Sequence, residues 1–471
     1  MQSTHHQGLR LGGLLLLLVL CFSSQAQVSS EIDAYVKQIM QRHGIPGIAV
    51  AVVQKDKVVH QNYYGLANIE HNVPVKTHSS FRLHSLSKIF VTTGLFKLIE
   101  QGKIRLEDPI SQYFTDLPST WQKVEIRHLL THSSGLADIA YVDAKTEPEA
   151  KALVFAQDIL FAPGERFHYN QSNYWLINRI IEQLSGTTFA DFIGTHQFPD
   201  LDPQRVFTPH AAAVIPNWAT EYEPLPGGKL ERGNFNVTDY LMGAAGISLT
   251  LEEFINWSQA LRNDKFMSRK TKNLMWSDFE MTDDEPHPYG WGKYMLNGKP
   301  SLGFTGGGRA GYRYFPEAEM SVIIMVNGYT SSIGIDQMIN YIAGNIDSDL
   351  KDSQTVVIEK TWQNFLQNAP EDGVKNCRKI VNENPKLDLE RTINSIGYHL
   401  AAKEAFGHAI ELFKLNTELY PEVWNVWDSL AEGYQMSGKN ALAIKYYKKS
   451  LVINPQNNHA VEQIAKMKGE D

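Results

Sequence analysis

Two apolar, β-branched parts of this chain lie far apart in the sequence, and they constrain its fold more than any other feature. The first part comprises residues 45–53 and 57–64, which are joined by a short charged turn, and the second comprises residues 320–327. Runs of this composition predict buried strands, and the short join predicts a hairpin between the first two. Helical periodicity dominates from about residue 85 to residue 265. We therefore expect an α/β (α+β) domain in which the late strands complete an antiparallel sheet and a helical lobe is inserted between its ends.

The C-terminal part repeats itself with a period of 34 residues. Gly397 matches Ala431, Phe413 matches Tyr447, and Pro421 matches Pro455. Small, aromatic and proline positions in this register resemble two tetratricopeptide repeats, at residues 390–423 and 424–457. Two repeats bury little surface alone, so the helical stretch that precedes them is expected to stack on them as a cap.

These patterns divide the chain into four segments. We expect a signal peptide over residues 1–26, a mixed domain over 27–346, a polar linker over 347–355 and an all-α repeat domain over 356–471.

The first 26 residues have the pattern of a secretory signal. Arg10 precedes the apolar run 11–22, and Ser24-Gln25-Ala26 offers small residues at the two positions that a signal peptidase reads. An uncleaved anchor is the alternative, and a lipid anchor at Cys21 is disfavoured because bulky Leu20 precedes it. We expect a secreted or periplasmic protein with no membrane span after signal removal, since no later apolar run reaches about 18 residues.

Charge and histidine spacing argue against two other classes of protein. The net charge is -8 and no long Lys/Arg run is present, so a nucleic-acid partner is not expected. His128 and His132 are four residues apart, as metal ligands on a helix can be, but the glutamate of the metalloprotease pattern does not stand between them. We therefore predict neither a metal nor another cofactor.

The run Ser85-Leu86-Ser87-Lys88 carries the candidate chemistry. If Ser85 begins a helix, Lys88 lies about one turn later on the same face. A buried ammonium beside other donors loses proton affinity, so a lysine placed there can help to remove the proton of the serine hydroxyl. Such a run can also be an ordinary helix start, and its context decides between the two readings.

Three further segments occur in a fixed order around this run. Residues 126–136 read IRHLLTHSSGL, residues 163–171 read PGERFHYNQ, and residues 304–312 read FTGGGRAGY. With these segments, residues 30–345 resemble the class C β-lactamase and penicillin-binding-protein-like serine hydrolases. The resemblance implies a Tyr-x-Asn element, in which Tyr169 takes the tyrosine place and Gln171 replaces the usual asparagine. The amide of Gln171 is kept on an arm longer by one methylene.

The resemblance also implies a Lys-Thr-Gly or His-x-Gly element on the strand beside the serine. Counting back without gaps from Gly311-Tyr312 puts Thr305 in the place of the cation and Gly308 at the oxyanion position. Anchoring on Thr-Gly-Gly instead puts Phe304 and Gly307 there. The ungapped register is preferred here, and neither register supplies a cation.

The expected reaction is a two-step acyl transfer without a cofactor. Ser85 attacks an ester or amide carbonyl, Lys88 and Tyr169 transfer its proton, and backbone N–H groups of Ser85 and Gly308 hold the oxyanion. The absent cation favours neutral ester or D-peptide-like substrates.

Two alternative functions stay open. The first is a β-lactamase or D,D-carboxypeptidase, with Arg309 as the substitute cation. The second, of another class, is a catalytically silent protein whose hydrolase lobe only holds a small-molecule or short-peptide ligand and whose repeats recruit a protein or peptide partner.

Overall fold

The computed structural model describes residues 27–207, 214–225, 229–330 and 332–469, so the expected signal peptide lies outside the described residues. The chain forms two compact units. One comprises Met1–Glu223 with Arg232–Leu350, and the other comprises Lys351–Asp471 with the short segment Pro224–Glu231. Each unit has a hydrophobic core of its own. The main division falls after Leu350, inside the segment expected to be a linker.

A seven-stranded antiparallel sheet organises the first unit. Its strands lie in the order β10 (Gly292–Leu296), β11 (Lys299–Gly306), β12 (Ala310–Phe315), β13 (Met320–Val326), β1 (Gly47–Gln54), β2 (Lys57–Asn68) and β3 (Val73–Pro74). The predicted hairpin is β1–β2, and β1 also pairs with β13, with Val50 opposite Ile324. The expected mixed domain, whose late strands complete the sheet begun by the early ones, is therefore confirmed.

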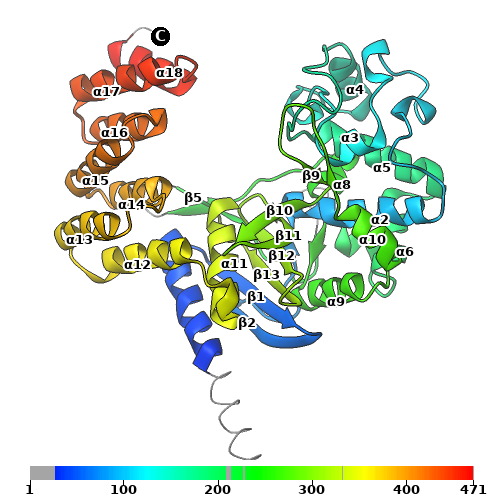
Figure 1. Ribbon diagram of the computed structural model, residues 1–471, viewed down its shortest axis with the longest axis horizontal. Helices are drawn as coiled ribbons and strands as arrows, with labels where there is room; N and C mark the ends of the chain where they lie inside the picture. Colours follow the sequence, from blue (N-terminus) through cyan, green and yellow to red (C-terminus); the bar gives the residue numbers. More distant parts are fainter. Residues whose placement is uncertain (1–26, 208–213, 226–228, 331, 470–471) are drawn as a thin grey trace, which may run out of the picture. The chain divides into compact units, whose positions relative to one another are not determined.

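The two faces of the sheet carry side chains of different size. On β1, Ile48, Val50 and Val52 face a core built with the helix at residues 27–43 and α11 (Ser332–Ile346). Ala49 and Ala51 belong to the core of the opposite face, where α9 (Leu251–Arg262) contacts β1 and β13. Since residues alternate between faces along a strand, one buried strand serves both layers. Figure 1 shows the sheet with α11 on one side and α2 and α9 on the other.

Helix α2 (Ser87–Glu100) is the centre of the second layer. Eleven of its residues, from Ser87 to Leu98, are buried, which fits a helix that is apolar on nearly every side. It contacts α5 (Gln171–Ser185), α6 (Phe189–Gln197), α8 (Met242–Ala245) and α10 (Arg269–Met275). The same unit also contains α3 (Ile126–Leu130), which packs on α5, α7 (Pro203–Val206), which packs on α6, and α4 (Glu147–Phe155). Short strands pair as β4 (Phe81–Arg82) with β7 (Ser248–Leu249), β5 (Tyr222–Pro224) with β6 (Leu230–Arg232), and β8 (Asp278–Phe279) with β9 (His287–Pro288).

From residue 351 onward the second unit is helical. It contains α12 (Ser353–Gln367), α13 (Pro370–Glu383), α14 (Glu390–Ala402), α15 (Phe406–Leu419), α16 (Trp424–Met436), α17 (Asn440–Ile453) and α18 (Asn458–Lys468). Helices α16 and α17 begin 34 residues after α14 and α15. Phe413 packs between Gly397 and Gly433, where any added side-chain carbon would clash with its ring. Across the described residues, no helix combines the length and apolar character that crossing a bilayer requires.

Candidate active site

Ser85 lies in a short 3-10 helix, His84–Leu86, that leads directly into α2. His84 has a φ of 50°, a left-handed backbone conformation that favours glycine, so the turn before Ser85 is strained. Ser85 is partly exposed and lines a cavity of about 430 Å³. Ser87, in contrast, is fully buried, and its hydroxyl accepts a hydrogen bond from the backbone N–H of Ile247 at 3.1 Å. Of the two serines, only Ser85 faces space that a substrate can occupy.

Lys88 is completely buried one turn after Ser85. Its ammonium donates to the side-chain oxygen of Gln171 and to the backbone oxygen of Ala244, each at 2.9 Å. The same nitrogen lies 4.9 Å from the ring centre of Tyr169 and 5.2 Å from that of Tyr174. Oxygen acceptors and aromatic faces together compensate the loss of water around this cation.

Tyr169 and Gln171 come from the segment that opens α5. The side chain of Asn170 accepts from the N–H of Ser172 and caps the helix, so Gln171 is its first residue. This places the Gln171 amide beside Lys88, while the Tyr169 ring lies over the lysine and stays 36% exposed. The longer arm of glutamine thus keeps an amide in contact with Lys88, and Gln171 lines the same cavity as Ser85.

His132 holds the peptide groups on both sides of Tyr169. Its backbone oxygen accepts from the N–H of His168 at 2.8 Å, and its Nδ1 accepts from the N–H of Asn170 at 3.2 Å. Its ring lies 4.5 Å from the Tyr169 ring. Burial, with a contribution from the charge of Lys88, holds the pKa of His132 well below its ordinary value. The ring is therefore neutral, with its proton on Nε2 because Nδ1 is an acceptor.

The third sequence element corrects the preferred register. Thr305 pairs with Gly311 across β11 and β12, on the face that packs against α11, and its hydroxyl donates to Asp336 at 2.8 Å. Phe304 lies on the opposite face, with its ring centre 6.3 Å from that of Tyr169. Since neighbouring residues of a strand point to opposite faces, Thr305 cannot take the place of the cation. The ungapped register is wrong, and Phe304 is the residue beside Tyr169.

The glycines after Phe304 bring β11 against the turn that holds Ser85. A side-chain carbon on Gly306 would lie 2.0 Å from the Leu83 oxygen, so only glycine fits there. Gly307 has a φ of 56° and lies against the ring of His84, the residue before Ser85. Gly308, the preferred oxyanion residue in the ungapped register, is buried, and its carbonyl accepts from Thr330. The contacts therefore favour Gly307 over Gly308 as the neighbour of Ser85.

Arg309, the possible substitute cation, is used elsewhere. Its guanidinium is buried and donates to the Tyr222 oxygen at 3.2 Å, to the Gly328 oxygen and to the Glu223 carboxylate. A guanidinium held in this way is not available to a substrate carboxylate.

A buried hydrogen bond between a histidine and a carboxylate supports the turn before Ser85. His84 Nε2 lies 2.7 Å from the Glu221 carboxylate. Although burial raises the pKa of Glu221, His84, with smaller contributions from Arg82 and Arg309, holds that pKa below its ordinary value.

His128 and His132, the pair considered as metal ligands, have structural hydrogen bonds instead. His128 Nδ1 accepts from the N–H of Glu125 and helps to cap α3. Within the described ranges no group of three His, Cys, Asp or Glu side chains is placed to hold a metal ion.

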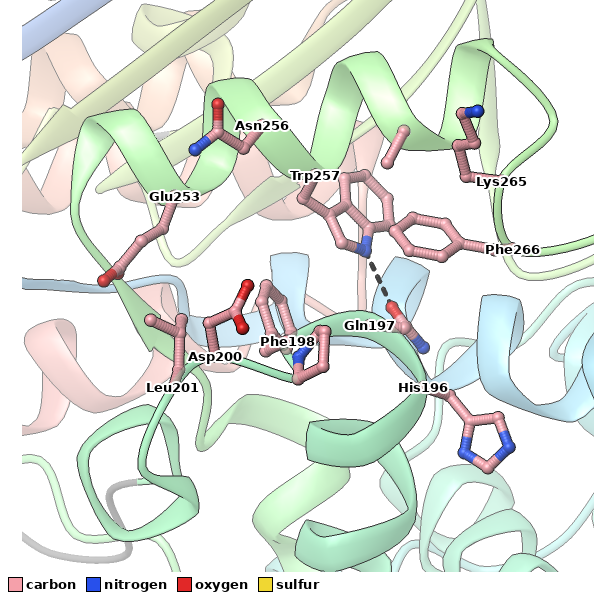
Figure 2. A pocket seen from close by; sticks show the side chains of 12 residues that line it. His196, Gln197, Phe198, Asp200, Leu201, Glu253, Asn256, Trp257, Lys265 and Phe266 are labelled. Atoms are coloured by element: carbon pink, nitrogen blue, oxygen red, sulfur yellow. Dashed lines mark hydrogen bonds between the residues drawn. The ribbon is translucent and has the colours of Figure 1, made fainter.

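A second cavity, of about 420 Å³, lies between α9 and the connection from α6 to α7 (Figure 2). At its edge the indole N–H of Trp257 donates to the Gln197 side chain at 2.7 Å, and Gln197 donates in turn to the Phe90 oxygen of α2 at 2.8 Å. Its lining contains none of the candidate catalytic residues, so it is not the candidate active site. The hydrogen bonds at its edge hold α2 against α6 and α9.

The fold is that of the penicillin-binding proteins. The octameric penicillin-binding protein homologue from Pyrococcus abyssi superimposes with a TM-score of 0.59 and 20% identity, over 70% of this chain and 81% of that one. A penicillin-binding protein from Bacillus halodurans gives a TM-score of 0.56 and 20% identity, over 64% of this chain and 98% of its own.

The family model described as Beta-lactamase matches residues 32–336, so the chain belongs to this family. Penicillin-binding protein 4* of Bacillus subtilis is 30% identical over 288 residues, which cover 56% of this chain and 62% of the relative. A β-lactamase of Yersinia enterocolitica is 25% identical, over 50% of this chain and 60% of its own. A D-aminopeptidase of Gluconobacter oxydans is 24% identical, over 64% and 59%. The chain thus spans about three fifths of the length of these relatives.

Sequence analysis did not predict two features of this site. The structural role of His132 has no local sequence signal, because its partners lie 36 and 38 residues later in the chain. The orientation of Phe304 could have been predicted from the alternation along the strand, since Leu302, Phe304 and Gly306 point to the face opposite the residues that face α11.

Proposed function

We propose that this protein is an exported serine hydrolase that forms an acyl-enzyme at Ser85 and hydrolyses neutral ester or D-peptide-like amide substrates. One observation carries the proposal. The partly exposed Ser85 lies in the 3-10 helix that leads into the buried helix α2, and the first turn of α2 presents the buried ammonium of Lys88 with the Tyr169 ring over it.

The proposed reaction uses these groups in two steps. The Ser85 oxygen forms a bond to the substrate carbonyl carbon while Lys88 and Tyr169 take its proton and pass it to the departing alcohol or amine. The N–H groups of Ser85 and Gly307 stabilise the negative oxygen of the intermediate. A water molecule then attacks the acyl carbon and gives its proton to Lys88 and Tyr169, which return a proton to the Ser85 oxygen as the acid is released.

The preference for neutral substrates rests on the finding that none of the described residues beside Tyr169 offers a substrate carboxylate a cation, apart from the buried Lys88, which is bound to Gln171 and Ala244. Phe304 occupies the position beside Tyr169, and Arg309 is bound to Glu223 and two backbone oxygens. The relatives include D-aminopeptidases, which supports an amide substrate, and a β-lactamase, which supports the alternative of a β-lactamase or D,D-carboxypeptidase.

Export and partner binding belong to the same proposal. The signal-like sequence of residues 1–26 supports export, and the 34-residue spacing of the helix pairs α14–α15 and α16–α17 supports two tetratricopeptide repeats. Repeats of this kind would bind a protein or peptide partner on their concave surface.

Labelling with a fluorophosphonate tests the central claim. We expect the purified protein to be labelled and Ser85→Ala to lose both labelling and p-nitrophenyl ester hydrolysis by several orders of magnitude. Ser87→Ala is the matched control. It removes a buried structural hydrogen bond at a cost of about 1–3 kcal/mol of stability, and it should still be labelled. A folded wild-type protein that resists labelling would favour the silent binding protein.

A further inference from the structure

The cavity beside Ser85 has a lining of uncharged side chains. Apart from Ser85, its walls come from two segments and from the start of α5. The residues are Ile139, Ala140, Tyr141, Val142, Ala144, Gln171, Phe235, Asn236, Val237, Thr238, Tyr240, Leu241, Ala244 and Ala245. None of these described side chains carries a charge, and most are aliphatic or aromatic. The second cavity differs, since its lining includes Asp200, Glu253 and Lys265 (Figure 2).

The cations near this cavity are covered. Lys88 is bound to Gln171 and to the backbone of Ala244, so its charge faces groups that form the wall. The guanidinium of Arg82 lies 5.4 Å from the ring centre of Phe235 and donates to the Phe235 oxygen at 2.8 Å. A substituent in the cavity therefore meets the outer surfaces of apolar side chains.

The position of the cavity relative to Tyr169 decides which part of a substrate enters it. The leaving group must lie beside Tyr169, which returns the proton. Tyr169 contacts Phe304 and His132, and it is not among the residues that line the cavity. Ser85 is one of them, so the cavity receives the group that stays on the serine after the first step.

We infer that this cavity is an acyl pocket that selects uncharged, apolar acyl side groups, such as a medium-length aliphatic chain or an aromatic ring. The inference rests on the proposed function and adds the class of acyl group that the enzyme prefers. Each methylene that moves from water into such a pocket contributes roughly a fourfold gain in kcat/KM while space lasts.

Two series of esters test this inference on the full-length protein. In the first, the p-nitrophenyl leaving group is constant and the acyl chain grows from acetate to hexanoate. We expect kcat/KM to rise more than about tenfold. In the second, the acetyl group is constant and the alcohol grows, and we expect a much smaller change. A flat or falling first series, or a steeper second series, would overturn the acyl-pocket assignment.

A charge placed in the wall gives a second, independent readout. Val142→Asp should lower kcat/KM for hexanoate at least about tenfold more than kcat/KM for acetate, because the new carboxylate lies where the longer acyl chain would be buried. Leu153→Asp is the matched control, because Leu153 is 44% exposed on α4 and does not line the cavity. An unchanged preference in Val142→Asp would also overturn the inference.

Fluorophosphonate labelling separates the two possible failures. If Ser85 is labelled and the acyl series is flat, the pocket inference fails and the proposed function stands. If Ser85 is not labelled and no ester is hydrolysed, both fail together.

Discussion

The ammonium of Lys88 and the amide oxygen of Gln171 are joined by a hydrogen bond of 2.9 Å, although 83 residues separate them in the chain. Gln171 is the residue that departs from the usual pattern of this family, and it is nevertheless the direct partner of the candidate proton carrier. Glutamine in place of asparagine at position 171 therefore changes both the surroundings of Lys88 and the shape of the substrate site. Substitutions of Gln171 test both effects.

Substitutions at Gln171 should act through Lys88. Gln171→Ala removes an acceptor from a charged donor, which corresponds to about a ten- to hundredfold loss in kcat. Gln171→Glu places a carboxylate against the Lys88 ammonium and should also lower kcat, whereas Gln171→Asn keeps an amide and is the control. We expect kcat to fall in Gln171→Ala and Gln171→Glu with KM changed less than about threefold, and Gln171→Asn to keep more of the activity. A rise in KM with kcat unchanged in all three variants would show that Gln171 serves substrate binding alone.

His132 should position Tyr169 through its Nδ1 acceptor. His132→Ala removes that acceptor and the ring beneath the tyrosine, and we expect kcat to fall by about ten- to a hundredfold with little change in KM. His132→Asn can place an oxygen near the Nδ1 position and should recover much of the loss, whereas His132→Gln should not. If the three variants differ only in thermal stability, His132 has a purely structural role.

The correction at β11 predicts where a cation would restore recognition of a carboxylate. Phe304→Lys places an ammonium beside Tyr169, and it should raise kcat/KM for nitrocefin relative to p-nitrophenyl acetate by about ten- to a hundredfold. Thr305→Lys is the control, because the side chain of residue 305 points toward Asp336 and α11. We expect no gain from it and a lower melting temperature. A gain from Thr305→Lys alone would restore the ungapped register.

The Glu221 carboxylate should make the turn before Ser85 sensitive to acid. The pKa of Glu221 is lower in the folded protein than its ordinary value of 4.5. The stability that this carboxylate contributes is thus present above that value and is lost as the pH falls through the folded pKa. We expect Glu221→Gln to lower the melting temperature most at about pH 7. The difference in melting temperature from wild type should shrink as the pH falls below 4.5. A difference that grows in acid would contradict this assignment.

Removal of residues 351–471 should leave ester hydrolysis within about threefold of wild type, because each unit has its own core and the candidate catalytic residues all precede the cut. The cut follows Leu350, which is buried in the core of the first unit. Circular dichroism establishes that the shortened protein is folded, and the p-nitrophenyl acetate assay gives its activity. A folded but inactive protein would mean that the C-terminal unit helps to build the site.

Much of this protein is determined locally by its sequence. Apolar runs at residues 45–53 and 320–327 predict the central strands, because buried strands need continuous β-branched side chains. The 34-residue period anticipates the spacing of the helices α14 to α17, since each repeat carries the same small and aromatic packing positions. Ser85, Lys88 and Tyr169 could be selected as candidates because short motifs with fixed spacing carry them.

The tertiary structure alone decided which groups meet. Phe304 and Thr305 are adjacent in sequence, and only the pairing of β11 with β12 under α11 determines which of them faces Tyr169. The sequence alone allows Arg309 to be a cation for a substrate carboxylate. In the fold its guanidinium is buried and donates to Glu223 and to two backbone oxygens. The uncharged acyl pocket is assembled from residues 139–144 and 235–245, which no local pattern connects. The physical reason is common to all three: hydrogen bonds and apolar contacts between distant segments depend on strand register and helix packing, which become defined only when the whole chain has folded.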